Sequence, residues 1–233
     1  MKTRKFLLGL VASVMSLTVA APAMAAELEV TGGVDIVSAS IWRGTVCGGP
    51  SIQPAATAAI AGFSVTAWAS QEIAAMGTNK GQSELDFTFA YEVGGFTVAY
   101  TNYWWTPDTP YFTKGTHLSE VTLAYQFGEK FPLAISWNTM VGGDQDYEDY
   151  STYIDFSYPF AVGSVDMAAS VAVTPWEGMY SNGKSGFQVA SVGLNGSKTI
   201  VETEKISIPV FVDLSFSPVQ KQAYLVAGVS FGF

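Results

Sequence analysis

Hydrophobic and polar residues alternate along most of the chain after its first 25 residues. The clearest alternation lies in residues 82–93, where one parity is apolar and the other is polar or small: Leu85, Phe87, Phe89, Tyr91 and Val93 against Glu84, Asp86, Thr88, Ala90 and Glu92. A period of two places alternate side chains on opposite faces of a sheet. We therefore predict an all-β chain built from amphipathic strands.

Twelve segments carry this pattern: residues 27–43, 51–61, 63–73, 82–93, 96–105, 116–127, 133–141, 150–160, 165–174, 187–195, 206–217 and 222–233. Most of these segments have lengths near the ~9–11 residues that a tilted strand needs to cross a bilayer. Short turns alternate with longer polar loops, as in an antiparallel up-and-down barrel. Two connections depart from this alternation, because the first loop, 44–50, is short and the opposite connection, 196–205, is long. Residues 187–195 have an ambiguous parity, so a ten-strand count stays open.

The last segment, residues 222–233, has one apolar face and ends on an aromatic residue, Phe233. An outward apolar face combined with an inward face of small or polar residues suits a strand of a membrane barrel. The segment resembles the closing strand of bacterial outer-membrane barrels, which implies recognition by the barrel-assembly machinery. An ordinary amphipathic strand is the alternative interpretation.

The N-terminus carries a basic head at Lys2, Arg4 and Lys5, an apolar run over residues 6–20, and small residues at 23–25. This arrangement predicts a secretory signal peptide over residues 1–25. The remaining residues, 26–233, are expected to form one outer-membrane barrel domain, exported to the cell outer membrane.

The composition is 48% hydrophobic and only 13% charged, yet no apolar run after residue 25 reaches the ~18–20 residues of a membrane helix. A barrel resolves this conflict because only every second residue faces lipid. Three of the 11 basic residues lie in the first 25 and none of the 20 acidic residues does, so residues 26–233 have a net charge of −12. This charge argues against nucleic acid as a partner. The single cysteine, Cys47, cannot form an internal disulfide.

Acidic residues dominate the predicted inward parity, where we place seven candidate pore-lining residues: Asp35, Arg43, Glu72, Asp86, Glu120, Asp155 and Asp213. Carboxylate rings favour cations in pores, so we expect a narrow channel with weak cation preference. The alternative is that these acids fill a closed barrel.

Arg43 is predicted near the outer end of the first strand, next to Trp42. It could be a constriction cation that orients an anionic group on a solute. Alternatively, it is a structural ion-pair partner, with Glu72 or Asp213 as the candidate acid.

Other chemistry is weakly indicated. His117 and Ser119 share a parity, but a nucleophile needs a base held in reach, and we expect no enzyme activity and no cofactor. Asp144, Asp146 and Glu148 offer alternate oxygen ligands without the rest of a calcium-binding loop, so a solvated loop is expected rather than a metal site. Aromatic residues gather at strand ends, where interfacial girdles or a sugar-stacking entrance would account for them: Tyr103, Trp104, Trp105, Tyr147, Tyr150, Trp176 and Tyr180.

Three motifs, Trp42-Arg43-Gly44, Ser51-Ile52-Gln53-Pro54 and Thr174-Pro175-Trp176-Glu177-Gly178, make the chain resemble the TorF-type porin family of small bacterial outer-membrane proteins over nearly its whole mature length. The resemblance implies outer-membrane placement. Cys47 stands where a polar residue or glycine is expected, which affects the shape of the first loop.

We expect a passive porin for small hydrophilic solutes, surrounded by outer-membrane lipid. The alternative function is a non-conducting barrel that is structural or binds partners through the outer loops 106–115 and 175–186. The sequence leaves open the solute and the oligomeric state.

Overall fold

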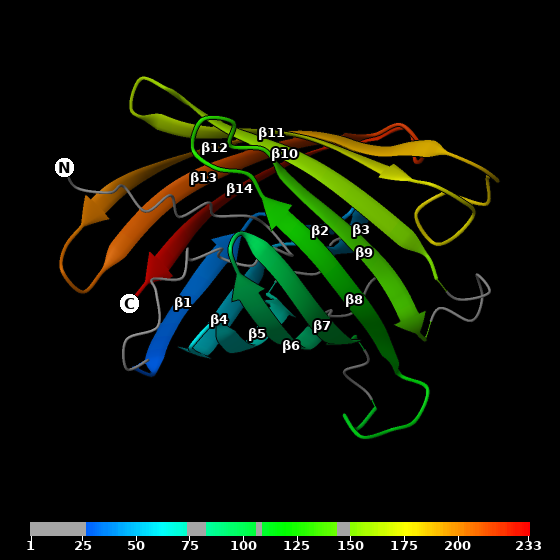
Figure 1. Ribbon diagram of the computed structural model, residues 1–233, viewed down its shortest axis with the longest axis horizontal. Helices are drawn as coiled ribbons and strands as arrows, with labels where there is room; N and C mark the ends of the chain where they lie inside the picture. The colour runs from blue at the N-terminus through cyan, green and yellow to red at the C-terminus, as the bar shows by residue number, and fades with distance from the viewer. Residues whose placement is uncertain (1–26, 74–82, 106–108, 144–149) are drawn as a thin grey trace.

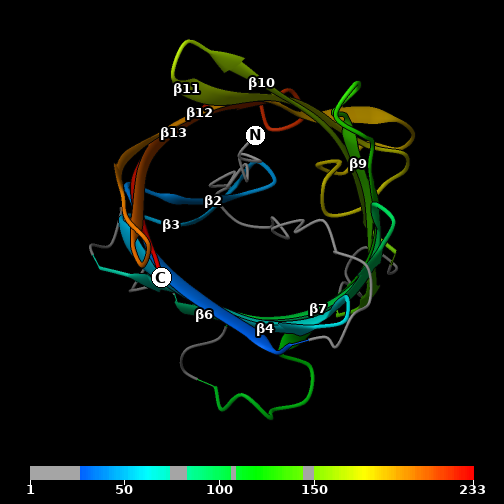
Figure 2. The same ribbon diagram turned by 60° about the vertical axis from the view of Figure 1, so that its left-hand side comes forward.

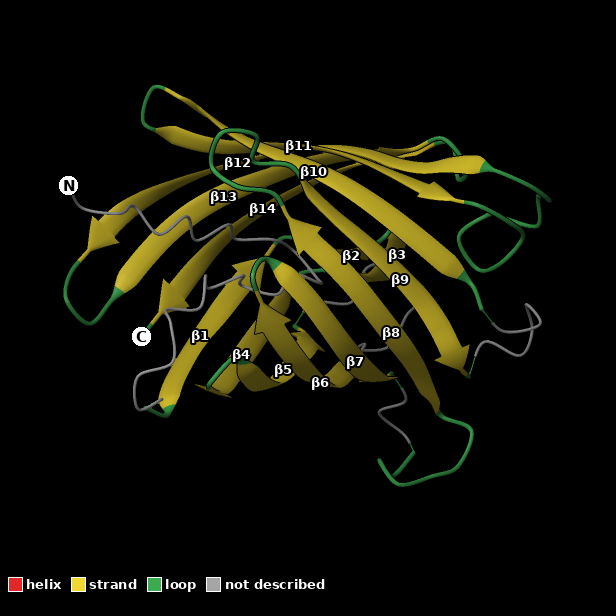
Figure 3. Cartoon of the chain, viewed as in Figure 1, coloured by secondary structure: helices red, strands yellow, loops and turns green. Residues whose placement is uncertain are grey.

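The computed structural model describes residues 27–73, 83–105, 109–143 and 150–233, and in these ranges every regular element is a β-strand (Figure 3). Twelve strands close into one antiparallel barrel, and two short strands form a separate hairpin (Figure 1). The predicted all-β barrel and its strand count of twelve are confirmed. The predicted signal peptide, residues 1–25, lies outside the described residues.

The barrel strands are β1 (Glu29–Val37), β4 (Ser51–Ile60), β5 (Phe63–Glu72), β6 (Ser83–Val93), β7 (Phe96–Trp104), β8 (His117–Gln126), β9 (Ala134–Gly142), β10 (Thr152–Val162), β11 (Val165–Thr174), β12 (Gln188–Glu202), β13 (Ser207–Ser217) and β14 (Gln222–Gly232). The separate hairpin consists of β2 (Ser40–Trp42) and β3 (Thr45–Gly48). Each barrel strand pairs with the barrel strands before and after it in the chain. β1 pairs with β4, because the β2–β3 hairpin between them in sequence is not part of the barrel.

The C-terminal strand closes the barrel. β14 pairs with β13 on one side and with β1 on the other, in a register that places Asp35 opposite Ser230. The backbones of Gly32 and Phe233 exchange two hydrogen bonds of 3.0 Å, which extends the pairing to the last residue. The aromatic final residue therefore belongs to the seam between the first and last strands.

The two ends of the barrel differ in their connections. Short turns join β4 to β5, β6 to β7 and β10 to β11 at one end, here called the turn end. The longer connections gather at the opposite end, here called the loop end. The predicted alternation of short and long connections is present, but the two exceptional connections were interpreted wrongly.

The first exception is the stretch predicted as the end of the first strand and a short loop. β1 ends at Val37, and residues 38–50 turn inward to form the β2–β3 hairpin, which lies inside the ring of barrel strands (Figure 2). Alternation continues past Val37 but in the opposite phase, with Ala39 and Ile41 apolar and Ser38 and Ser40 polar, so the predicted single strand overlooked a change of phase.

The second exception is the stretch 196–205, predicted as a long turn. β12 instead continues for 15 residues to Glu202, with an irregularity in its pairing to β13 between Thr199 and Val201. An extra residue in one strand disturbs the period of two, which explains why the alternation was unreadable here.

The outer surface of the barrel is an apolar belt. Its exposed side chains include Val65, Leu123, Leu194 and Leu214, each at least 40% exposed. Aromatic side chains follow the turn end in two groups of ring contacts, with centres 4.4–6.1 Å apart: Phe63 with Tyr91, and the series Phe96, Tyr125, Phe127, Phe131 and Tyr158. Within the described ranges no helix is long and apolar enough to cross a membrane, a result that does not bear on strands.

Gly228 gives a test of packing inside the barrel. A Cβ atom there would lie 2.3 Å from Cζ of Phe211, whose ring covers the glycine. We expect Gly228→Ala to lower the free energy of unfolding by about 1–3 kcal/mol through overpacking, measured by urea titration of the refolded barrel. Gly128→Ala is the matched control, since a Cβ there meets nothing within 4 Å. Equal midpoints for the two variants would contradict the expected clash.

Candidate functional site

The β2–β3 hairpin carries Arg43 and Gly44 at its tip. Both residues have positive φ angles, 48° and 82°, as the tight two-residue turns of hairpins require. Glycine adopts this conformation at little cost, whereas a positive φ is uncommon for arginine. Arg43 is thus a residue of the inserted hairpin, and its predicted place in the barrel wall is wrong.

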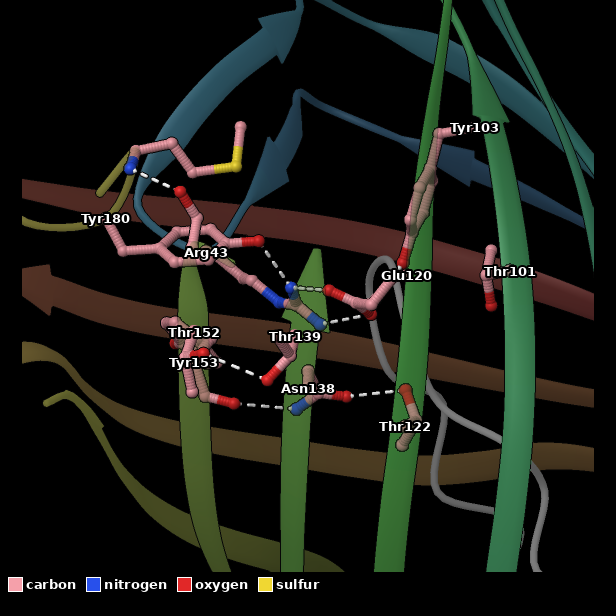
Figure 4. Close-up of polar contacts among 12 residues, drawn as sticks. Arg43, Thr101, Tyr103, Glu120, Thr122, Asn138, Thr139, Thr152, Tyr153 and Tyr180 are labelled. Carbon is pink, nitrogen blue, oxygen red and sulfur yellow. Dashed lines mark hydrogen bonds and ion pairs between the residues drawn. The ribbon is translucent and has the colours of Figure 1, made fainter. Parts of the chain in front are cut away.

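The guanidinium of Arg43 forms a bidentate ion pair with Glu120 of β8 (Figure 4). Nη2 donates to Oε1 of Glu120 at 2.9 Å, and Nη1 donates to the other carboxylate oxygen and to the Tyr180 hydroxyl, the latter at 2.6 Å. The Tyr103 hydroxyl also donates to Glu120, at 3.0 Å. The two charged side chains are 6% and 2% exposed. The acid is therefore Glu120, and not the predicted Glu72 or Asp213.

Aromatic rings enclose the same guanidinium. Its Cζ atom lies 4.8 Å from the ring centre of Trp42, 4.9 Å from that of Tyr153 and 5.3 Å from that of Tyr180. Such contacts add cation–π attraction to the ion pair. Burial by itself lowers the pKa of Arg43, but Glu120 and the neighbouring tyrosines outweigh this effect and raise it well above its usual value. Arg43 is therefore charged.

This aromatic cluster corrects the interpretation of several aromatic residues as interfacial. Trp42 contacts Tyr103, Trp105 and Tyr180 with ring centres 5.6–5.7 Å apart. These rings belong to the core around the hairpin. Trp104 and Trp176 instead contact Tyr111 and Trp137 respectively. Tyr147 lies outside the described residues.

Polar contacts hold both the base and the tip of the hairpin. At the base, Gln53 donates to the hydroxyls of Ser40 and Ser70, at 3.2 and 3.3 Å. Glu72 accepts a hydrogen bond from the Gly49 backbone N–H at 2.7 Å. At the tip, the Tyr224 hydroxyl of β14 donates to the Gly44 carbonyl at 2.9 Å. Because Arg43 pairs with Glu120 of β8, which lies across the ring from β14, the hairpin spans the loop end of the lumen.

Apolar packing adds to these polar anchors. Ala39 and Ile41 of the hairpin segment pack on a small core formed by Val37, Phe211 and Val226. On the other face, a narrow crevice separates the hairpin from the wall, lined by Ser40, Cys47, Gly48, Ser51, Ser70, Ser83, Glu84 and Trp105. Burial, with Glu84 and Asp86 nearby, raises the pKa of the Cys47 thiol to about 12. The thiol is thus protonated, and its side chain is half-buried.

The remaining candidate acids are distributed around the wall. Asp86 of β6 is 8% exposed, and its Oδ1 has no hydrogen-bond partner. Asp35 of β1 accepts a hydrogen bond from Ser230, while Asp155 and Asp213 lie on β10 and β13, on the same parity as the buried Tyr153 and Phe211. The structure thus brings together Arg43 and Glu120, and leaves the other candidates on separate strands.

The inward positions nearer the turn end carry small side chains, among them Ala55, Thr57, Ala59, Ser64, Thr66, Thr88, Ala90, Ala124, Ser136, Ser157, Ala168 and Gly193. Some of their hydroxyls pair across strands, as Thr57 does with Thr66 at 2.8 Å. Apart from Trp68 of β5, which is opposite Ala55, the inward side chains at this level are therefore mostly short, and the main cluster of rings surrounds the hairpin.

Tyr153 and Tyr180 were not identified as partners of Arg43 from the sequence. Tyr180 comes from the connection between β11 and β12, and is separated from Arg43 by 137 residues. The conspicuous motif Trp42-Arg43-Gly44 was the one available signal, since it places a cation and an aromatic ring beside a turn-forming glycine. Its partners could be found only after folding.

The residues considered for catalysis and metal binding are placed elsewhere. His117 contacts Asn102 and the Tyr111 carbonyl, and the hydroxyls of Ser119 and Tyr100 are 2.9 Å apart. Within the ranges that the structure describes, no group of three His, Cys, Asp or Glu side chains could hold a metal ion. The acidic triplet Asp144, Asp146 and Glu148 lies outside those ranges.

No protein-family model matches the chain, and a comparison with curated proteins gives no match. The geometry alone therefore defines the site as a closed β-barrel whose loop end is spanned by an inserted, ion-paired hairpin.

Proposed function

We propose that the protein is an outer-membrane barrel of the porin type, in which the β2–β3 hairpin forms the constriction of a channel for small hydrophilic solutes. The observation that carries this proposal is the inserted hairpin itself. Its tip is held by Arg43 and Glu120 above a lumen lined by short side chains. Large barrels commonly enclose a polar interior that loops narrow or plug.

Two further features support a membrane location. The outward face is apolar over most strands, and aromatic rings follow the turn end. Both features are typical of barrels in lipid, where aromatic side chains mark the interfaces. With the N-terminal signal pattern, they favour the outer membrane, as the resemblance to TorF-type porins also implies.

The lumen charge favours cations. In the part of the chain that the structure describes, every lysine is exposed, and Arg43 is neutralised by Glu120. Asp35, Asp155 and Asp213 remain on inward parity. Because carboxylates attract cations to a pore, we expect the open channel to prefer K⁺ over Cl⁻.

The test is single-channel recording of the refolded mature protein in a planar bilayer with a KCl gradient. We expect small current steps whose reversal potential indicates cation preference. Asp155→Asn combined with Asp213→Asn should reduce that preference, whereas Glu129→Gln, at an exposed turn, is the control. An anion-selective reversal potential would overturn the proposed cation preference.

The alternative function is a non-conducting barrel that binds partners through its outer loops. The wall-to-wall anchoring of the hairpin favours it, since a permanently seated hairpin would leave a narrow passage at most. A barrel that remains silent even after removal of the hairpin would establish this alternative over the channel.

A further inference from the structure

We propose that Arg43 has a second seat, the carboxyl pair Glu84 and Asp86 on β6, and that the hairpin switches between this seat and Glu120. The proposal concerns regulation of the constriction and rests on the proposed function only for its physiological role. The switch itself is a property of the folded barrel, whether or not the barrel conducts.

The second seat lacks a cation in the present arrangement. Glu84 and Asp86 are both 8% exposed and share the inward face of β6, where their carboxyl groups hydrogen-bond to each other, and Oδ1 of Asp86 has no hydrogen-bond partner. Buried carboxylates are costly unless they are paired. No metal-binding group exists within the described residues, and Arg43 is the cation that those residues place inside the barrel.

The register places the second seat within reach of a tilting hairpin. β6 and β8 are separated only by β7, so these two strands lie two strand spacings apart, about 10 Å. Asp86 is level with Tyr103 and Leu118, which places it two residues nearer the loop end than Glu120. Movement of Arg43 to Asp86 would therefore raise the hairpin tip toward the loop end, away from the lumen.

The packing around the hairpin is compatible with movement in that direction. The crevice beside Cys47 and Gly48 lies between the hairpin and the wall that carries Glu84. The opposite face of the hairpin segment is packed on Val37, Phe211 and Val226. Two discrete arrangements of one element, each with its own ion pair, make a bistable switch.

A double-mutant cycle between Glu120→Gln and Asp86→Asn tests the second seat, with unfolding in urea as the measurement. In the wild type, Asp86→Asn should leave stability unchanged or raise it, because no cation faces the Asp86 carboxyl there and its Oδ1 atom has no hydrogen-bond partner. In the Glu120→Gln background, it should lower stability, because Asp86 then holds Arg43. We expect a coupling of about tenfold in the folding equilibrium constant.

Two matched variants locate the coupling. Asp35→Asn removes another inward carboxylate, which Ser230 already binds, and its effect should add to that of Glu120→Gln. Asp155 of β10 also lies within the field of Arg43. The proposal would be overturned if the stability effect of Glu120→Gln were coupled to that of Asp155→Asn and not to that of Asp86→Asn. It would also be overturned if the effects of Glu120→Gln and Asp86→Asn simply added.

The native cysteine reports the accompanying movement. Cys47 lies on β3 and is half-buried beside the wall near Glu84, so maleimide labelling should be slower in the wild type than that of a free thiol. Glu120→Gln should accelerate labelling as the tip rises, and an unchanged rate would contradict the movement. Unfolding in urea and maleimide labelling do not depend on current through the barrel. The two proposals are therefore tested separately, and either one can fail while the other holds.

Discussion

Arg43→Met is expected to lower the free energy of unfolding by about 3–5 kcal/mol, the usual result of removing one partner of a buried ion pair. The variant keeps a long apolar side chain for Trp42, Tyr153 and Tyr180. It leaves Glu120 with the Tyr103 hydroxyl as its partner, at 3.0 Å, and without a counter-ion. Urea titration of the refolded barrel, followed by tryptophan fluorescence, measures the loss.

The double variant Arg43→Met with Glu120→Leu is the control for this prediction. It removes the isolated carboxylate as well as the guanidinium, and replacing a whole buried pair by apolar residues is often neutral or stabilising. We therefore expect it to recover most of the lost stability. If Arg43→Met alone matched the wild type, the ion pair would be a surface-like contact that contributes little.

Removal of the hairpin is expected to produce the largest functional change. Val37 pairs with Ser51, so the next residues of the two strands can be joined directly. Replacing residues 39–49 by Asn-Gly supplies a two-residue hairpin turn and leaves the twelve barrel strands intact. The deletion removes Trp42, Arg43 and the backbone of the hairpin from the loop end of the lumen, so large and steady current steps should replace the small ones of the wild type.

The comparison needs a variant that keeps the hairpin. Cys47→Ser is suitable, because it changes one atom within the hairpin and leaves its anchors at Gly44 and Gly49 in place. Its current should match that of the wild type. A deletion variant that folds, as judged by circular dichroism, and passes no more current than Cys47→Ser would refute the constriction by the hairpin.

Most barrel strands could be predicted because a barrel wall repeats one local rule. β6 illustrates this, since its inward acids and outward aromatic residues alternate without interruption over 11 residues. Where an irregularity breaks the period, as between Thr199 and Val201 of β12, the prediction became a turn. Alternation is thus a sensitive indicator of regular pairing and a poor one of bulged pairing.

The candidate site was predicted in part. Arg43 and Glu120 were both selected as inward charged residues by parity, but Arg43 was assigned to Glu72 or Asp213, and Glu120 was given no partner. They are 77 residues apart in the chain, and Tyr180 is farther still. No local pattern specifies such a pairing, because it depends on which strand ends meet across the lumen.

The sequence by itself determined the fold class and the most regular wall strands, because strand periodicity and turn chemistry are local properties of the chain. Only the tertiary structure decided that residues 38–50 leave the wall, enter the lumen and pair Arg43 with Glu120. The physical reason is that a buried cation and its aromatic cluster are stable only where the closed barrel brings distant strands around them.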